Sequence, residues 1–103
     1  MKDLRKDAEL GDAEAQYKLG VAYFAGHFGV PTDEAEGVKW WRKAAEQAHT
    51  GAQQQLAYAY YSGSGVPKDR SEALKWYKMA ADLGDSDAQI FLDTFYSGGR
   101  ASF

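Results

Sequence analysis

Paired acidic side chains have the type and spacing that acid–base chemistry would need. Each pair stands just ahead of a run with helical apolar periodicity: Asp33 and Glu36, Asp69 and Glu72, and Asp85 and Asp87. Two carboxylates held close together can act as general acid and general base. An Asp-x-x-Glu pattern before an apolar run instead favours a capping box, in which Asp accepts first-turn amides and Glu reaches back to the cap. We therefore interpret these carboxylates as helix caps and as partners of the helix dipole.

The other residues that could bind ligands or react are isolated. His27 and His49 have no partner at the spacing of a metal site. Gly63-Ser64-Gly65 has the Gly-x-Gly form of a phosphate loop, but it does not follow a predicted strand. The chain has no cysteine, and no nucleophile stands in a recognisable triad or elbow context. The sequence therefore predicts that the protein is not an enzyme and has no metal site and no cofactor.

The charge balance argues against nucleic acid and membranes as partners. The net charge is −3 and the isoelectric point is about 5.3, so the chain has no general attraction for phosphate backbones or anionic lipid. Basic residues gather on two predicted helices: Lys39, Arg42, Lys43, Lys75 and Lys78. We interpret them as a solvated outer face, with a small ridge for an acidic partner as the alternative.

Aromatic and amide side chains recur along three predicted helices and suit protein recognition. The set, which we call the tyrosine face, is Tyr17, Lys18, Val21, Phe24, Gln54, Gln55, Tyr58, Tyr61, Ile90 and Thr94. Aromatic rings supply large contact areas at protein interfaces. The predicted partner is a peptide or a protein segment that lies along this face. The alternative is that several of these side chains pack against neighbouring helices.

An internal repeat positions these residues. Residues 30–53 align with residues 66–89 at an offset of 36, and 10 of the 24 positions are identical. From Ala15, Ala52 and Ala88, apolar or small residues follow at the spacing of one helix face. Self-similarity at a period of about 20 to 50 residues is typical of a repeat solenoid. The sequence therefore predicts an all-α fold of antiparallel helix pairs.

Two kinds of helix alternate along the predicted array. The A helices are expected at about 13–25, 51–62 and 86–97, the B helices at about 34–47 and 70–83, and the end of another B helix at 2–10. The chain is predicted to be a single domain, with a half repeat 1–11, repeats 12–48 and 49–84, and a half repeat 85–103. Gly37 is expected to weaken its helix by about 0.5–1 kcal/mol relative to alanine. Ala48 stands where Gly11 and Gly84 can form a left-handed cap, so its helix is expected to end differently.

The repeat resembles the Sel-one-like repeat family, a branch of the tetratricopeptide-type α/α superhelices. The second repeat carries the family motif at Ala52, Leu56, Tyr60, Gly63, Gly65, Val66, Pro67, Asp69, Ala73, Leu74, Trp76, Tyr77, Ala80, Ala81 and Gly84. The first carries it at Ala15, Leu19, Gly20, Tyr23, Gly26, Gly29, Val30, Pro31, Asp33, Trp40, Lys43, Ala44 and Ala45. Met79 replaces the motif lysine, and the loop 26–29 has one extra residue. The resemblance implies a right-handed superhelix and a non-catalytic adaptor or scaffold that binds other proteins.

The predicted array leaves its C-terminal end uncovered. The last helix carries a run of apolar residues: Ile90, Phe91, Leu92, Phe95 and Tyr96. We expect self-association through this end or continuation into a longer array, with a tail that places Phe103 in the gap as the alternative. The second functional hypothesis is therefore a structural or regulatory part of a larger assembly that acts through its ends.

The N-terminal residues carry information about location. Residues 1–10 are charged throughout and do not resemble a secretory signal. No stretch of the chain approaches the roughly 20 apolar residues of a membrane span. Together with the lack of cysteine, these features favour a cytoplasmic location.

Overall fold

The fold is an array of helices in which each helix packs mainly against the helices before and after it in the sequence. The computed structural model describes residues 3–27 and 29–98, and within these residues it contains helices and no strand. The helices are α1 (Leu4–Glu9), α2 (Ala13–Ala25), α3 (Glu34–Ala45), α4 (Thr50–Ser62), α5 (Arg70–Asp82) and α6 (Ser86–Gly98). The predicted all-α repeat solenoid is confirmed, and the observed bounds lie within about two residues of the predicted ones.

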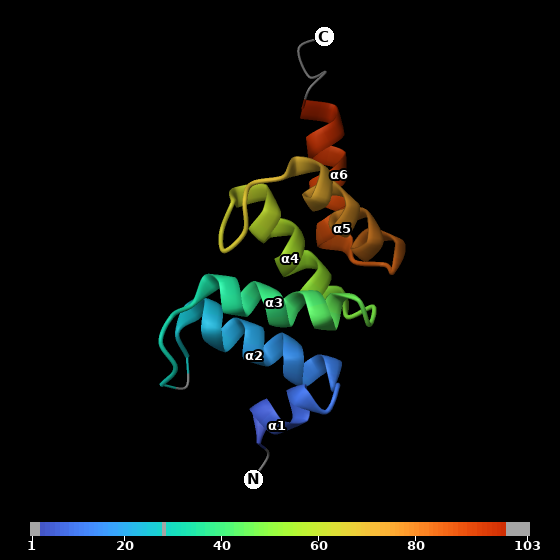
Figure 1. The fold of residues 1–103 in the computed structure, drawn as a ribbon. Helices are drawn as coiled ribbons and strands as arrows, with labels where there is room; N and C mark the ends of the chain where they lie inside the picture. The colour runs from blue at the N-terminus through green and yellow to red at the C-terminus, as the bar shows by residue number, and fades with distance from the viewer. Residues whose placement is uncertain (1–2, 28, 99–103) are drawn as a thin grey trace.

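The molecule is elongated along the direction of the array. Figure 1 shows the helices following one another from α1 to α6, with the chain ends at opposite ends of the molecule. The extents are 55 × 25 × 17 Å, and the radius of gyration is 14.5 Å. In a solenoid of this kind each helix pair buries its apolar side only by stacking on its neighbours.

Aspartate side chains cap four of the described helices: Asp3 caps α1, Asp12 caps α2, Asp33 caps α3 and Asp69 caps α5, the last two as predicted. The carboxylate of Asp12 accepts hydrogen bonds from the backbone N–H groups at the start of α2. Asp33 and Asp69 do the same for α3 and α5, each at 3.1 Å from the N–H three residues on. These bonds satisfy amides that have no partner inside the helix.

The predicted hydrogen bonds from the Glu36 and Glu72 side chains back to the cap residues are wrong. The backbone N–H of Asp33 donates to the carbonyl of Tyr23 at 2.7 Å, and that of Asp69 donates to the carbonyl of Tyr60 at 2.9 Å. Because these N–H groups already donate to carbonyl groups of the preceding A helix, the glutamate side chain three residues further on does not accept from them. The cap residue instead ties each B helix to the C-terminal part of its own A helix.

The prediction that α3 ends differently from the other B-type helices is also wrong. Ala48 adopts a left-handed conformation with φ 66°, like Gly11 at 102° and Gly84 at 97°. Its N–H donates to the carbonyl of Ala45 at 3.0 Å, and the next N–H, that of His49, donates to Ala44 at 3.2 Å. The same pair of bonds closes α1 and α5. The chain must turn in the same way to place the next A helix, so alanine accepts a conformation that glycine adopts more readily.

Small residues let the two helices of each pair approach closely. The predicted inward faces of α3 and α5 lie inside the core, with Trp41 and Trp76 3% and 4% exposed. Leu19 and Leu56 of the A helices are also buried, as predicted. A Cβ atom added to Gly37 would lie 2.7 Å from the carbonyl oxygen of Gly20, so the glycine expected to weaken α3 is required by this contact.

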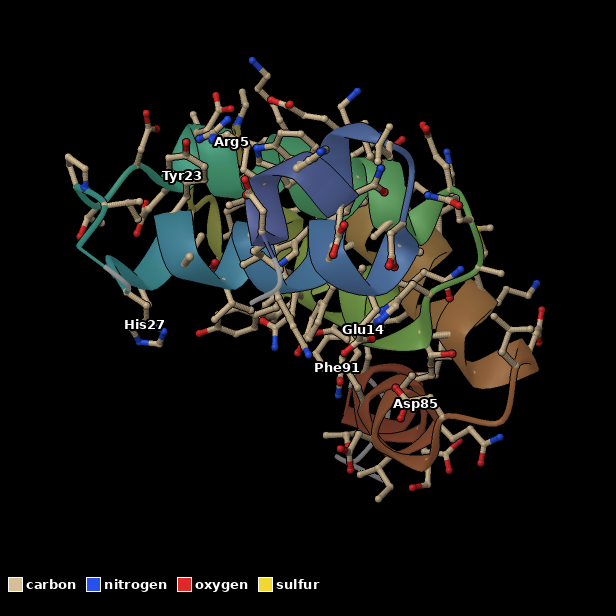
Figure 2. All side chains as sticks on the ribbon, turned by 90° about the horizontal axis from the view of Figure 1, so that it is seen from below. Arg5, Glu14, Tyr23, His27, Asp85 and Phe91 are labelled. Atoms are coloured by element: carbon tan, nitrogen blue, oxygen red, sulfur yellow. The ribbon has the colours of Figure 1, made fainter. Side chains whose placement is uncertain are left out.

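Polar links between successive helices repeat with the sequence period. The guanidinium of Arg5 in α1 donates to the hydroxyl of Tyr23 in α2, and Arg42 in α3 donates to Tyr60 in α4. In Figure 2 the side chains of Arg5 and Tyr23 point toward one another from α1 and α2. Each guanidinium also lies over its tyrosine ring, at 5.6 Å and 5.5 Å from the centroids. These links hold α1 against α2 and α3 against α4.

Candidate protein-binding face

The tyrosine face lies on α2, α4 and α6, and none of its residues is fully buried. Its exposed members are Lys18, Tyr58, Ile90 and Thr94. Its half-buried members are Tyr17, Val21, Phe24, Gln54, Gln55 and Tyr61. Tyr58 and Ile90 are the large apolar members most open to solvent, at 54% and 62% exposed. The face is therefore divided between side chains that pack and side chains that are available for contact.

The part of the face on α2 is used largely for packing between helix pairs. The ring of Tyr17 stacks on His49 with centroids 4.7 Å apart, and Phe24 lies 4.8 Å from Trp41. Val21 is half-buried against the same core. Packing against neighbouring helices, the alternative weighed for this set, thus accounts for these three side chains.

The part of the face on α4 and α6 contains a cluster of aromatic rings. Tyr77 of α5 stacks on Phe91 of α6 with centroids 3.9 Å apart, and Tyr61 of α4 meets the same ring edge-on at 5.2 Å. Figure 2 places Phe91 on the side of α6 that faces the rest of the array. We call Tyr58, Tyr61, Tyr77 and Phe91 the aromatic cluster. Its outer member, Tyr58, lies one turn before Tyr61 on α4, and its hydroxyl is near enough to Tyr77 to raise the pKa of Tyr77.

Burial makes the Tyr77 hydroxyl a weaker acid than an ordinary tyrosine hydroxyl. Desolvation, together with the smaller effect of the neighbouring Tyr58 and Tyr61 hydroxyls, raises the pKa of the Tyr77 hydroxyl from 10.0 to about 12. A buried phenolate would lose its hydration without a compensating positive charge. The side chain therefore remains a neutral phenol over the whole physiological range.

Sequence reasoning missed two contributors to this region. Tyr77 was assigned to the inward face of a B helix and Phe91 to the open end, because their contact depends on how α5 and α6 cross. The repeat alignment could have indicated this contact. Tyr77 occupies the position of Trp41 one repeat earlier, and the Trp41 ring packs against Phe24 of an A helix.

His49 was considered only as a metal ligand, and the structure gives it another role. Its Nδ1 accepts the backbone N–H of Ala52 at 3.0 Å, so it caps α4 as Asp12 caps α2. Its Nε2 lies 2.7 Å from Oε1 of Glu14, and its ring stacks on Tyr17. His49 therefore connects the first A helix to the second, and its place in the repeat, that of Asp12, could have indicated the cap.

The outer side of α6 remains exposed at the C-terminal end of the described chain. Ile90 and Tyr96 are 62% and 57% exposed, whereas Phe91, Leu92 and Phe95 are half-buried. The hypothesis that Phe103 fills this gap lies outside the described residues.

Across residues 3–27 and 29–98, no three His, Cys, Asp or Glu side chains gather closely enough to hold a metal ion. No helix in this part of the chain has the length and apolar character needed to cross a membrane.

Comparison with known proteins places the repeat in a family. The sequence profile of the Sel1 repeat matches residues 13–49 and 50–85. Among solved structures, a Sel1 repeat protein from Oxalobacter formigenes superposes with a TM-score of 0.87 at 43% identity, over 93% of this chain and 39% of that one. A protective antigen of uropathogenic Escherichia coli with an SLR fold superposes with a TM-score of 0.86 at 40% identity, over 92% of this chain and 20% of the other.

Similar stretches occur in longer plant proteins. An F-box protein of Arabidopsis thaliana is 42% identical over 59 residues, which are 57% of this chain and 16% of that protein. HRD3A of the same plant, a component of an ERAD-associated E3 ubiquitin-protein ligase, is 32% identical over 62 residues, or 60% and 9% of the two chains. The chain thus spans less than a fifth of these curated relatives. With two profile matches that cover most of its length, the chain belongs to the Sel1 repeat family.

Proposed function

We propose that this protein is a non-catalytic protein–protein interaction module that binds a peptide or protein segment on the tyrosine face. The observation that carries the proposal is that Tyr58 is 54% exposed on α4, one turn before Tyr61, whose ring packs against Phe91. A large exposed ring next to a rigid aromatic surface has the character of an interface anchor.

The chemistry around Tyr58 fits an extended or helical segment. Gln54 and Gln55 lie on the same helix and remain partly accessible, so their carboxamides can exchange hydrogen bonds with a peptide backbone. Ile90 and Thr94 extend the accessible surface onto α6. A partner bound here would gain most from covering Tyr58 and Ile90, because these side chains have the most apolar area left to bury.

The relatives support an interaction role rather than a reaction. The Sel1 repeat profile matches most of this chain, and HRD3A is named as a component of an ERAD-associated E3 ubiquitin-protein ligase. The F-box protein likewise carries the matching stretch within a longer chain. An adaptor or scaffold role for this chain is part of the proposal.

The experiment is selection of peptides from a random display library on the immobilised protein. Tyr58→Ser removes the exposed ring without opening the core, and Lys78→Ser on α5 is the matched control, since Lys78 is exposed and outside the tyrosine face. We expect enriched peptides to bind wild type and Lys78→Ser equally and to bind Tyr58→Ser at least about tenfold more weakly. Equal binding to all three proteins would refute the assignment of the face.

The second candidate function is a structural role through the exposed side of α6. The observation that favours it is that Ile90 and Tyr96 present large apolar side chains on one helix. Sedimentation velocity over a wide concentration range tests it: association is expected for wild type and should be lost in Ile90→Lys. A wild-type protein that stays monomeric throughout would contradict self-association.

A further inference from the structure

In α2 and α4 a buried glutamine in the first turn bonds back to the preceding B-type helix. The side-chain Nε2 of Gln16 donates to the carbonyl of Ala8 at 3.1 Å, and that of Gln53 donates to Ala45 at 3.1 Å. A carbonyl oxygen can only accept, so this bond fixes which end of the amide faces it. The Oε1 atom of each glutamine is therefore directed away and needs a donor from elsewhere.

At the first of these junctions, where α1, α2 and the end of α3 meet, the donor is present. Nε2 of Gln47 lies 2.9 Å from Oε1 of Gln16 and 3.0 Å from the carbonyl oxygen of Gly11. One carboxamide nitrogen thus bridges two acceptors, one on α2 and one in the turn that precedes α2. The arrangement is a complete hydrogen-bonded site for an N–H donor.

At the second junction, where α3, α4 and the end of α5 meet, the acceptor recurs without the donor. Gln53 stands where Gln16 stands, but Leu83 occupies the position of Gln47. Gln53 is 1% exposed, and its Oε1 has no hydrogen-bond partner among the described residues. A buried carbonyl oxygen without a donor is unfavourable, so a group that supplied one would be bound.

A pocket of about 300 Å³ opens at this place. It is lined by Ala45, Glu46, Ala48, Gln53, Met79, Asp82 and Leu83. The volume lies at the lower end of the range for small-ligand sites, which suits one long side chain rather than a whole peptide. None of these residues belongs to the tyrosine face, so the pocket is a separate site.

The lining combines acidic groups with an apolar wall. Met79 stands where the first repeat has Lys43, so the second junction lacks the cation at that position as well as the donor of Gln47. Neither Glu46 nor Asp82 forms an ion pair within the described part of the chain. The pocket therefore offers a neutral acceptor and two carboxylates, with no positive charge among its lining residues.

We propose that this pocket binds the guanidinium group of an arginine side chain supplied by a protein partner. A guanidinium carries five N–H donors in a planar fork, so it can donate to a pocket carboxylate and to Gln53 Oε1 at the same time. Because Oε1 is closed to solvent in this structure, binding requires the side chains that cover it to move aside. It is also less strongly hydrated than an ammonium group, and its methylene stem can lie on Met79 and Leu83. The bond from Gln47 to Gln16 in the first junction shows that this acceptor geometry takes an N–H donor.

The test is a titration of the ¹⁵N-labelled protein with N-acetyl-arginine N-methylamide, followed by NMR. We expect saturable shifts of the Gln53 side-chain amide and of the backbone amides of Met79 and Leu83. The norleucine analogue has a similar apolar stem and no donor, and it should produce no saturable shift. The lysine and glutamine analogues should bind more weakly, because one has a compact hydrated charge and the other has no charge.

Leu83→Gln is the matched variant of the protein. Its carboxamide is expected to reach Oε1 of Gln53 as Gln47 reaches Gln16, so arginine binding should fall at least about tenfold while the fold is retained. The reverse change, Gln47→Leu, removes the donor from the first junction and leaves the second junction intact, so binding at Gln53 should be unchanged. A raised melting temperature for Leu83→Gln would independently show that the acceptor had gained a partner.

Three results would overturn the proposal. The first is no saturable shift at Gln53 up to the solubility limit of the probe. The second is equal binding by wild type and Leu83→Gln, and the third is equal binding of the arginine and norleucine analogues.

Discussion

Replacement of Gly37 by alanine is expected to destabilise this protein, although alanine is the better helix former. Propensity alone would make Gly37→Ala stabilising by about 1 kcal/mol. In the structure, the added Cβ would lie 2.7 Å from the carbonyl oxygen of Gly20 and 3.0 Å from the backbone nitrogen of Phe24. Both atoms belong to the backbone of α2, so no side-chain rotation can relieve the contact.

The size of the effect follows from these two opposing contributions. Overpacking typically costs about 1–3 kcal/mol, and a clash with backbone belongs at the upper end of that range. After subtraction of the propensity gain, we expect a net loss of about 2 kcal/mol. For a chain of this size, that corresponds to a fall in the melting temperature of about 8–16 °C.

Thermal and urea unfolding, followed by far-ultraviolet circular dichroism, measures the effect. Ala73→Gly is the control, because Ala73 occupies the position of Gly37 in the second repeat and is 0% exposed. Propensity alone gives the two substitutions opposite signs, whereas the structure predicts that both destabilise. A Gly37→Ala protein that melted at or above the wild-type temperature would show that α2 and α3 are not in close contact.

Two further predictions concern helix ends and alkaline stability. Ala48→Gly should raise the free energy of unfolding by up to about 1 kcal/mol, because glycine adopts the left-handed conformation of residue 48 without strain. Gly84→Ala should lower it by a similar amount, although the added Cβ would meet no atom within 4 Å. Urea unfolding midpoints measure both effects, and an unchanged midpoint for Ala48→Gly would show that Ala48 is not strained. Between pH 10 and about 12 the unfolded chain loses the Tyr77 proton while the folded chain keeps it, so stability should fall as the pH rises through this window. The loss attributable to Tyr77 is at most about 2–3 kcal/mol, and urea unfolding of Tyr77→Phe at both ends of the window should lack it; an identical loss in both proteins would refute the assignment.

Helix positions were predicted well because their signals are local. Asp12, Asp33 and Asp69 each cap a helix through amides within three residues, so the sequence pattern contains both partners of the bond. The buried positions of Leu19 and Leu56 were equally accessible, since helical spacing identifies the inward face. The part of the tyrosine face that packs, at Tyr17 and Phe24, could not be separated from the part that is open, because exposure depends on neighbouring helix pairs.

The errors share a different cause. The expected reach of Glu36 back to its cap failed because the Asp33 N–H is taken by Tyr23, a residue of another helix. The expected change of helix ending at Ala48 failed because the turn is set by where the next helix must lie, and this requirement outweighs the intrinsic preference for glycine.

The amino-acid sequence by itself determined the repeat period, the helices, their caps and their buried faces. Each of these depends on residues within one or two helical turns of one another. The tertiary structure alone decided that Gly20 and Gly37 touch, that His49 joins two A helices, and that Gln47 completes a site which Leu83 leaves open. These features depend on distances between groups on different helices. Such distances are set by how the helices pack within a pair and between pairs, and a difference of an ångström decides whether a hydrogen bond or a clash results.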